Sequence, residues 1–316
     1  MIALLSGGTG GAKLARGFAQ LLGDPADLAV IANVGDDVWV YGVHVSPDPD
    51  LVTYWLADLI DDRGFGIRGD SWRVMEALEQ RGQDTWFRLG DQDLALCLLR
   101  TERLRAGQRQ TVAQQAVADA LGVRARVLPA TDQPLRTRVR AAGAWLDFQE
   151  FMIRRRAQGP IEAVEFEGAD KAAPTREVAA ALASARLIVI GPSNPVISIG
   201  PILAIAGVRA ALADRQVPAI AVSPFVGGHA VKGPTDDFCR FAGIEASASG
   251  VARAYAGLID GIVADEPVRG LPHRLVDTLM DDEPGRLRVA RTVLELAAEL
   301  GAALPPTLLG KVTPRS

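Results

Sequence analysis

The N-terminal segment is a short apolar strand that ends in a glycine-rich turn, after which an amphipathic helix begins. Residues 2–5 are apolar, and residues 6–13 have the sequence SGGTGGAK. A turn of this kind directs backbone N–H groups and the N-terminus of the helix at one point, which favours an anion there. The segment therefore predicts a phosphate-binding loop between the first strand and the first helix.

The glycine spacing departs from the two common nucleotide-binding fingerprints. A Walker loop needs a second glycine before its lysine and a Ser or Thr after it, and Lys13 has neither neighbour. The dinucleotide pattern G-x-G-x-x-G fits Gly8 and Gly10 but has Lys13 at the third glycine, and Asn33 ends the second strand where an acid would bind the ribose. The spacing therefore argues against NAD. The alternative is that the glycines serve only the tight turn from strand to helix.

Short apolar runs alternate with helical periodicity along most of the chain, which is typical of a parallel sheet covered by helices. We predict an α/β fold with a doubly wound, mostly parallel Rossmann-like sheet. Residues 1–70 and 170–316 would form this nucleotide-binding domain, and residues 71–169 would be inserted as an α+β lid or side lobe. The strongest strand predictions are residues 2–5, 28–33, 187–190, 219–222 and 261–264. The loops after such strands should converge on one crevice.

Composition excludes several classes of protein. The chain has 316 residues, 48% of them hydrophobic, and its net charge of −4 gives no electrostatic sign of nucleic-acid binding. The N-terminal apolar stretch has no basic leader and is interrupted by glycine, so it predicts neither a signal peptide nor a membrane span. Cys97 and Cys239 lack metal-ligand spacing. We expect two buried free thiols in a cytoplasmic protein that binds neither membranes nor nucleic acid.

Acidic residues follow the second predicted strand. Residues 33–37 are NVGDD, and residues 46–50 are SPDPD at the start of a predicted helix. Two prolines stiffen the segment that presents Asp48 and Asp50, and carboxylate oxygens are ligands that Mg²⁺ prefers. The alternative is structural, with Asp50 capping the helix and Asp36 and Asp37 forming a turn.

Two further loops follow predicted strands and are rich in hydrogen-bonding groups. Residues 191–201 (GPSNPVISIGP) contain Ser193 and Asn194, and residues 223–234 (SPFVGGHAVKGP) contain Ser223 and Lys232. Loops this stiff and polar suit a ligand better than a plain connection. With the glycine-rich turn they predict a phosphate or nucleotide crevice, in which Lys232 would supply a counter-charge.

Residues 86–94 (WFRLGDQDL) place two aromatic residues and an arginine before an acidic helix start. This segment could form a surface for a flat aromatic ligand, because Arg88 can stack on a ring or donate in a fork. The alternative is that Trp86 and Phe87 belong to the core and that Asp91 is an N-cap.

Taken together, these motifs closely resemble the 2-phospho-L-lactate transferase family of coenzyme F420 biosynthesis. The resemblance runs from Met1 to about Pro267, in the same order and spacing, and it rests on the glycine-rich turn, the DDVW segment at 36–39, SPDPD at 46–50, FRLGD at 87–91, GPSNP at 191–195 and KGP at 232–234. A related group of nucleotide-sugar-binding gluconeogenesis factors shares the glycine turn and the Pro-Ser-Asn type of loop, but it looks different after the second strand.

The resemblance implies a magnesium-dependent transfer of a 2-phospholactyl or enolpyruvyl-phosphate group from a guanosine diphosphate adduct to the ribityl hydroxyl of Fo, a riboflavin-like deazaflavin, with release of GMP. It also implies a homodimer. Asp48 and Asp50 would hold Mg²⁺ and act in catalysis, and Asp50, Arg88 and Asp91 would contact Fo. The residues expected to bind the nucleotide and its phosphates are Gly8, Thr9, Gly10, Lys13, Asn33, Ser193, Asn194, Ser223 and Lys232.

Two functions from other classes stay open at this point. A nucleotide-sugar-binding regulator of the related group would bind its ligand without turnover and without Fo. An NAD-linked oxidoreductase would need the dinucleotide fingerprint, which Lys13 and Asn33 interrupt. Ligand-induced thermal shifts separate these functions from the transferase, because a ligand stabilises only the protein that binds it.

Overall fold

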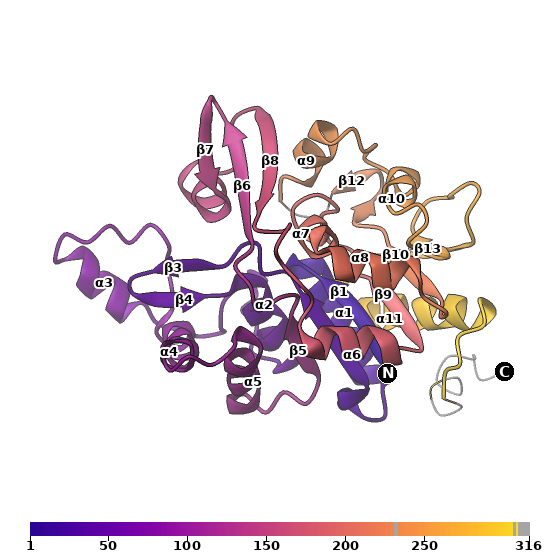
Figure 1. The fold of residues 1–316 in the computed structure, drawn as a ribbon, viewed down its shortest axis with the longest axis horizontal. Helices are drawn as coiled ribbons and strands as arrows, with labels where there is room; N and C mark the ends of the chain where they lie inside the picture. The colour runs from indigo at the N-terminus through magenta and orange to yellow at the C-terminus, as the bar shows by residue number, and fades with distance from the viewer. Residues whose placement is uncertain (231–232, 306–307, 309–316) are drawn as a thin grey trace.

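The computed structural model describes residues 1–230, 233–305 and 308, and its core is a seven-stranded parallel sheet (Figure 1). All pairings in this sheet are parallel. The strands in spatial order are β14 (His273–Leu275), β13 (Gly261–Ala264), β10 (Ala219–Val222), β9 (Leu187–Ile190), β1 (Ile2–Ser6), β2 (Leu28–Ala32) and β5 (Arg126–Pro129). The predicted parallel α/β sheet and its five strongest strands are therefore confirmed.

The side chains of β1 alternate between two apolar layers. Ile2 and Leu4 belong to one buried cluster, and Ala3 and Leu5 belong to the other. Because successive side chains of a strand point to opposite faces, an apolar residue at every position requires cover on both sides of the sheet. This pattern explains why helices lie on both faces.

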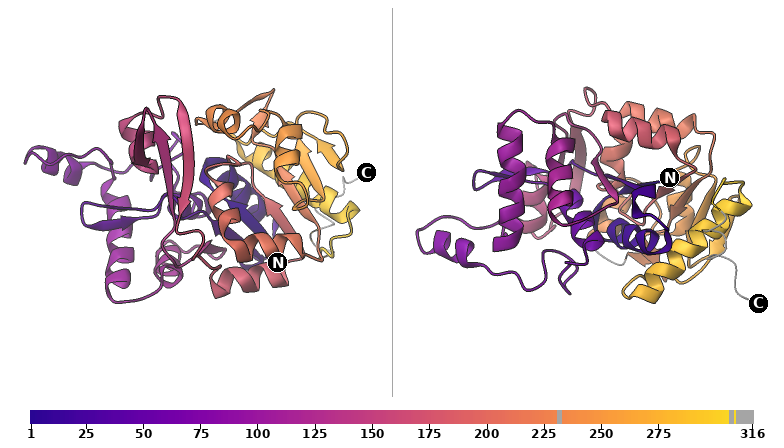
Figure 2. Two further views of the ribbon diagram at one scale, coloured as in Figure 1. Left: turned by 45° about the horizontal axis from the view of Figure 1, so that its top comes forward. Right: turned by 90° about the horizontal axis from the view of Figure 1, so that it is seen from below.

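The helices divide between the two faces as the two clusters do (Figures 1 and 2). The first face carries α1 (Gly8–Leu21), α2 (Pro47–Leu56) and α11 (Glu283–Glu299). The second face carries α6 (Arg176–Ser184), α7 (Ile199–Ala204), α8 (Ala206–Ala213) and α10 (Ala248–Ala254). The C-terminal helix α11 packs against α1, where a Cβ on Gly17 would lie 2.5 Å from the carbonyl oxygen of Arg286.

The remaining elements surround the sheet. The hairpin β3 (Val38–Val40) and β4 (Val43–Val45) projects with α3 (Arg73–Glu79) at one end of the molecule in Figure 1, above α4 (Asp91–Arg105) and α5 (Gln110–Ala120). A second antiparallel sheet consists of β7 (Ala144–Asp147), β6 (Arg136–Ala141) and β8 (Ile161–Glu167), with a π-helical turn at Glu150–Arg154. The short elements are a 3₁₀ turn (Pro25–Asp27), β11 (Phe225–Val226), β12 (His229–Ala230) and α9 (Thr235–Phe241).

Residues 71–169 lie partly inside the central sheet. Strand β5 pairs with β2, although it falls in the middle of this segment. The antiparallel sheet β7-β6-β8 and the helices α3 and α4 lie outside the central sheet. The division of the chain into domains at residues 70 and 170 stays a prediction.

The strand order reverses at β1. The chain runs outward from β1 to β2 and β5 on one side, then returns to β9 and runs outward through β10, β13 and β14 on the other. In open parallel sheets, ligands bind beyond the carboxyl ends of the strands at such a reversal. The fold therefore predicts that a ligand binds at the loops after β1 and β9.

The cysteines and the lengths of the helices bear on two further predictions. Cys97 and Cys239 are buried free thiols, as expected. No helix in the described part of the chain is both long and apolar enough to cross a membrane.

Candidate functional site

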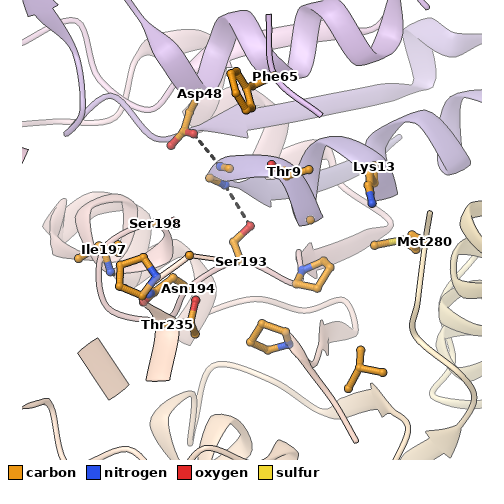
Figure 3. Close-up of a pocket in the computed structure, with 18 of the residues that line it drawn as sticks. Thr9, Lys13, Asp48, Phe65, Ser193, Asn194, Ile197, Ser198, Thr235 and Met280 are labelled. Carbon is orange, nitrogen blue, oxygen red and sulfur yellow. Dashed lines mark hydrogen bonds between the residues drawn. The ribbon is translucent and has the colours of Figure 1, made fainter. Parts of the chain in front are cut away.

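A cavity of about 590 Å³, here called the central pocket, opens at the carboxyl ends of β1, β9 and β10. Its walls come from the glycine-rich turn at 7–10, the loop at 192–194 and the start of the loop at 223–224 (Figure 3). These segments are far apart in the sequence, and the predicted convergence of the loops on one crevice is confirmed.

Most of the predicted nucleotide-binding residues line this pocket. They are Gly8, Thr9, Gly10, Lys13, Ser193, Asn194 and Ser223. Asn33 is fully buried and is not among the lining residues. Lys232 lies outside the described residues. A role of these residues in nucleotide binding stays a prediction that the geometry supports.

The glycine-rich turn is held in contact with both neighbouring walls. The Gly7 N–H donates to Ser193 Oγ over 3.3 Å, and the Gly8 N–H donates to Asp48 Oδ1 over 2.7 Å. A Cβ on Gly10 would lie 2.0 Å from the carbonyl oxygen of Pro192, closer than atoms can approach. The glycines therefore serve close packing as well as lining the pocket, so the structural alternative describes part of their role.

Asn194 offers the pocket a hydrogen-bond donor. Its Oδ1 accepts from the backbone N–H groups of Val196 (2.8 Å) and Ile197 (3.2 Å), which fixes the orientation of the amide. Its Nδ2 is buried and has no partner among the described residues. A buried donor without a partner is costly, so the pocket favours an acceptor oxygen at this point.

Lys13 lies on the opposite side of the pocket from Asn194 in Figure 3. Its Nζ pairs with Asp281 Oδ1 at 2.7 Å, and it lies 5.9 Å from the ring centroid of Trp55. The Asp281 side chain is 64% exposed. An anionic ligand can therefore compete with a solvated carboxylate for the ammonium group.

Two buried carboxylates share one amide at the wall of the pocket. Asn33 Nδ2 donates to Asp36 Oδ1 over 3.0 Å and to Asp48 Oδ2 over 2.9 Å, and both acids line the pocket. Burial, followed by the charge of Asp48, raises the pKa of Asp36 well above its ordinary value. Burial likewise raises the pKa of Asp48 to about 6. Two crowded acids of this kind favour a cation between or beside them.

The oxygen-rich pair fits a hard divalent ion. Mg²⁺ usually takes one or two carboxylates of the protein, with water and phosphate oxygens completing its shell. Asp36 and Asp48 meet that requirement beside the glycine-rich turn. The sequence pattern is compatible with Asp36 as a turn residue and as a metal ligand. Its position just after β2 is the signal that favours the role of a ligand.

Asp50 lies in a buried ion pair and is not among the residues that line the central pocket. Its carboxylate forms a two-point ion pair with Arg100, whose guanidinium is fully buried and whose Nη1 lies 3.1 Å from Asp50 Oδ2. The Asp50 carboxylate holds the pKa of Arg100 above its usual range against the opposing effect of burial. Gln114 Oε1 accepts from Arg100 Nη2 over 3.0 Å. The proposed metal-binding and catalytic roles of Asp50 stay predictions, and the residue is absent from the pocket lining.

A second group of ligand-type side chains surrounds this ion pair. Single ligand atoms of Asp50, Asp93 and Cys97 lie within 4.8 Å of one another. The Arg100 guanidinium already supplies a positive charge there, and burial raises the pKa of the Cys97 thiol well above its ordinary value. The negative charge of this group is therefore balanced by Arg100, and the group does not require a metal ion.

Arg88 and Asp91, the predicted Fo contacts, also lie outside the pocket lining. Arg88 pairs with Glu79 at 3.1 Å, and its guanidinium carbon lies 5.3 Å from the ring centroid of Trp72. Asp91 accepts from Ser71 Oγ and from the first backbone N–H groups of α3. Contact of either residue with Fo stays a prediction.

The neighbouring aromatic residues belong to a core cluster. Phe87 is buried, and Trp86 packs against the same cluster as Phe87 and Met75. The core interpretation is therefore confirmed for Phe87, whereas Trp86 is partly buried at the edge of the cluster. Helix α4 has Gly90 as its N-cap, so Asp91 caps α3 rather than its own helix.

Several lining residues lie outside the sequence motifs described above. They come from the segment before α3 (Arg63, Phe65), the antiparallel lobe (Phe148, Met152) and the segment before α11 (Thr278, Leu279, Met280, Asp281). None of these segments directly follows one of the five strands that were predicted most strongly from the sequence. Only the folded arrangement brings them to the pocket.

Comparison with known proteins agrees with these features. The chain matches the family model of 2-phospho-L-lactate transferase CofD over residues 2–283. It is 39% identical over 309 residues to a protein of Methanopyrus kandleri named 2-phospho-L-lactate transferase, covering 95% of this chain and 98% of that one. It is 37% identical over 325 residues to a protein of Mycobacterium tuberculosis (strain H37Rv) named phosphoenolpyruvate transferase, covering 94% and 98%.

A solved structure supports the fold. The crystal structure of a UPF0052 family member from Bacillus halodurans aligns with a TM-score of 0.59 at 19% identity and covers 93% of this chain and 98% of that one. At this identity the likeness concerns the fold alone. The family match spans most of the sequence, including the glycine-rich turn and the acidic segment. This chain belongs to the 2-phospho-L-lactate transferase (CofD) family.

Proposed function

We propose that this protein transfers a phosphorylated three-carbon acid from a guanosine diphosphate adduct to the ribityl hydroxyl of Fo, with release of GMP, in coenzyme F420 biosynthesis. The observation that carries this proposal is the central pocket, which places a glycine-rich helix start beside two buried carboxylates. The family membership and the names of the relatives support the same chemistry. Magnesium dependence, a homodimeric assembly and a cytoplasmic location belong to the proposal.

The donor binds through its diphosphate. The start of α1 supplies backbone N–H groups and a positive dipole end. Lys13 supplies a charge, and Asn194 supplies the buried Nδ2 that has no partner among the described residues. Ser193, whose Oγ already accepts from Gly7, holds the turn in place.

The transfer forms one P–O bond and breaks another. The ribityl oxygen of Fo attacks the phosphorus that carries the three-carbon acid, and the bridging oxygen of the diphosphate leaves on GMP. The hydroxyl proton passes to the Asp48 carboxylate and from there to solvent. Asp36 and Asp48 would hold Mg²⁺, which supplies charge neutralisation at the transferred phosphoryl group. The chemistry needs positioning and charge stabilisation, which this pocket offers. It requires no nucleophilic attack by a side chain of the protein.

Product analysis tests the proposal directly. We expect a product of the mass of Fo plus the phosphorylated acid when the protein is incubated with Fo, Mg²⁺ and a guanylated donor, and we expect equimolar GMP. Parallel reactions with phospholactate and phosphoenolpyruvate adducts identify the transferred group. Thermal shifts should show stabilisation by GDP and none by NAD, since a ligand at a hundredfold its Kd stabilises by about 2.7 kcal/mol. Binding of a nucleotide sugar without any turnover of Fo would support the regulator instead.

Gly10→Ala is expected to weaken both the fold and donor binding, because the added Cβ meets the Pro192 carbonyl. Overpacking of this kind costs about 1–3 kcal/mol. Gly23→Ala is the matched control, since nothing lies within 4 Å of a Cβ there. Urea unfolding and calorimetric titration with GDP measure the two effects. Unchanged GDP affinity in a destabilised Gly10→Ala protein would leave the glycines with a packing role only.

A further inference from the structure

Phe65 is an exposed aromatic side chain in the wall of the central pocket. Its side chain is 58% exposed. It lies in the connection between α2 and α3, which an antiparallel bridge between Ile60 and Ile67 closes at its base. Gly64 and Gly66 on either side have φ values of +81° and +72°, a region that glycine enters at little cost. The backbone therefore holds Phe65 in a tight turn at the edge of the pocket.

A row of alternating guanidinium groups and aromatic rings leads to Phe65. The guanidinium carbon of Arg63 lies 5.1 Å from the Phe65 ring centroid and 5.9 Å from that of Trp72. The guanidinium carbon of Arg88 lies 5.3 Å from the Trp72 centroid. Such cation–π contacts fix the rings relative to one another. Arg88, although outside the pocket, is thus connected to the pocket wall through Trp72 and Arg63.

The position of Phe65 relative to Asp48 indicates which of the two substrates lies against this side of the pocket. In Figure 3 the Phe65 ring and the Asp48 carboxylate both lie above the start of α1, whereas Ser193 and Asn194 lie below it. The diphosphate of the proposed donor belongs at the start of α1, between these two sides. The side that contains Asp48 must receive the attacking hydroxyl, and the ring system of the acceptor is attached to that hydroxyl by a short chain.

We propose that Phe65, backed by Arg63, is the stacking surface for the flat conjugated ring of the acceptor. The inference rests on the proposed function and assigns a binding surface within the same site. Conjugated heterocycles stack on aromatic side chains whatever their hydrogen-bonding edges, so the purine of the donor offers the same chemistry. The position of Asp48 selects the acceptor.

Calorimetric titrations of the full-length protein with Fo, and separately with GDP, test the assignment in the presence of Mg²⁺. Phe65→Ala should raise the Kd for Fo about tenfold, the scale of losing one stacked ring. Phe65→Trp should restore binding to within about threefold of wild type. The Kd for GDP should stay unchanged in both variants. In steady state, the KM for Fo should rise while kcat at saturating Fo is retained.

Phe241→Ala is the matched control, because Phe241 is 39% exposed on α9 and does not line the central pocket. It should bind Fo and GDP as the wild-type protein does. Wild-type affinity of Phe65→Ala for Fo would overturn the inference while leaving the proposed function intact. A loss of GDP affinity alone would overturn it in favour of the purine. A wild-type protein that binds GDP but neither binds nor converts Fo would overturn both.

Discussion

Asp48→Asn is expected to lower turnover by at least about a hundredfold, the usual scale for losing a positioned acid–base group. The substitution preserves size and leaves one oxygen to accept from the Gly8 N–H, but it removes the second oxygen, which accepts from Asn33 Nδ2, and the charge and basicity beside Asp36. With one carboxylate fewer, the Mg²⁺ concentration needed for half-maximal activity should also rise. Steady-state rates across a Mg²⁺ titration, with Fo and donor saturating, measure both effects.

Asp58→Asn supplies the control for this experiment. The Asp58 side chain is 72% exposed, and its φ of +60° suits asparagine as well as aspartate. It should retain wild-type turnover and Mg²⁺ dependence. If Asp48→Asn did the same, neither proton transfer nor metal binding could be assigned to Asp48.

Asp50→Asn is expected to destabilise the fold by about 3–5 kcal/mol, because it leaves the fully buried Arg100 guanidinium without its counter-charge. Arg100→Met should cost a similar amount, since it leaves the Asp50 carboxylate buried and unpaired. Chemical unfolding followed by circular dichroism measures both. A loss below about 1 kcal/mol in both variants would show that the pair is solvated.

The double variant Asp50→Leu with Arg100→Met separates stability from catalysis. Replacing both partners of a buried ion pair by apolar residues is often nearly neutral, so this protein should recover much of the stability that either single change removes. Its turnover then tests the direct catalytic role predicted for Asp50. Activity near that of the wild-type protein would assign Asp50 to positioning α2, and a stable but inactive protein would return Asp50 to the chemistry.

The central strands were predictable because they are buried on both faces. In β1, β2, β9, β10 and β13, apolar residues occupy nearly every position and a turn residue follows, so length and composition alone locate them. Strand β6 was missed, although its sequence RTRVRA alternates arginine with smaller residues, as a strand buried on one face does. The pairing of β5 with β2 was also missed, because an apolar run does not specify its neighbour.

The site was predictable where loops follow those strands. The convergence of the glycine-rich turn with Ser193 and Asn194 follows from parallel topology. The pairing of Asp48 with Asp50 as metal ligands stays a prediction, and the two side chains point in different directions because residues two apart differ by about 200° around a helix. Asp48 meets Asn33 and Asp36, and Asp50 meets Arg100, fifty positions later in the chain. No local pattern in the sequence indicates that partner.

The place of β1 in the sheet affects the order in which the molecule is completed. One edge of β1 pairs with β2, which follows it closely in the chain, and the other edge pairs with β9, which is synthesised much later. The hydrogen bond from Gly7 to Ser193 joins residues that are 186 positions apart in the chain. During synthesis the glycine-rich turn therefore emerges long before its opposite wall exists. Closing so long a loop is entropically costly until the second half of the sheet has docked. We expect nascent chains that end before β9 to lack any affinity for the donor, so that ligand binding marks the moment when the two halves have joined.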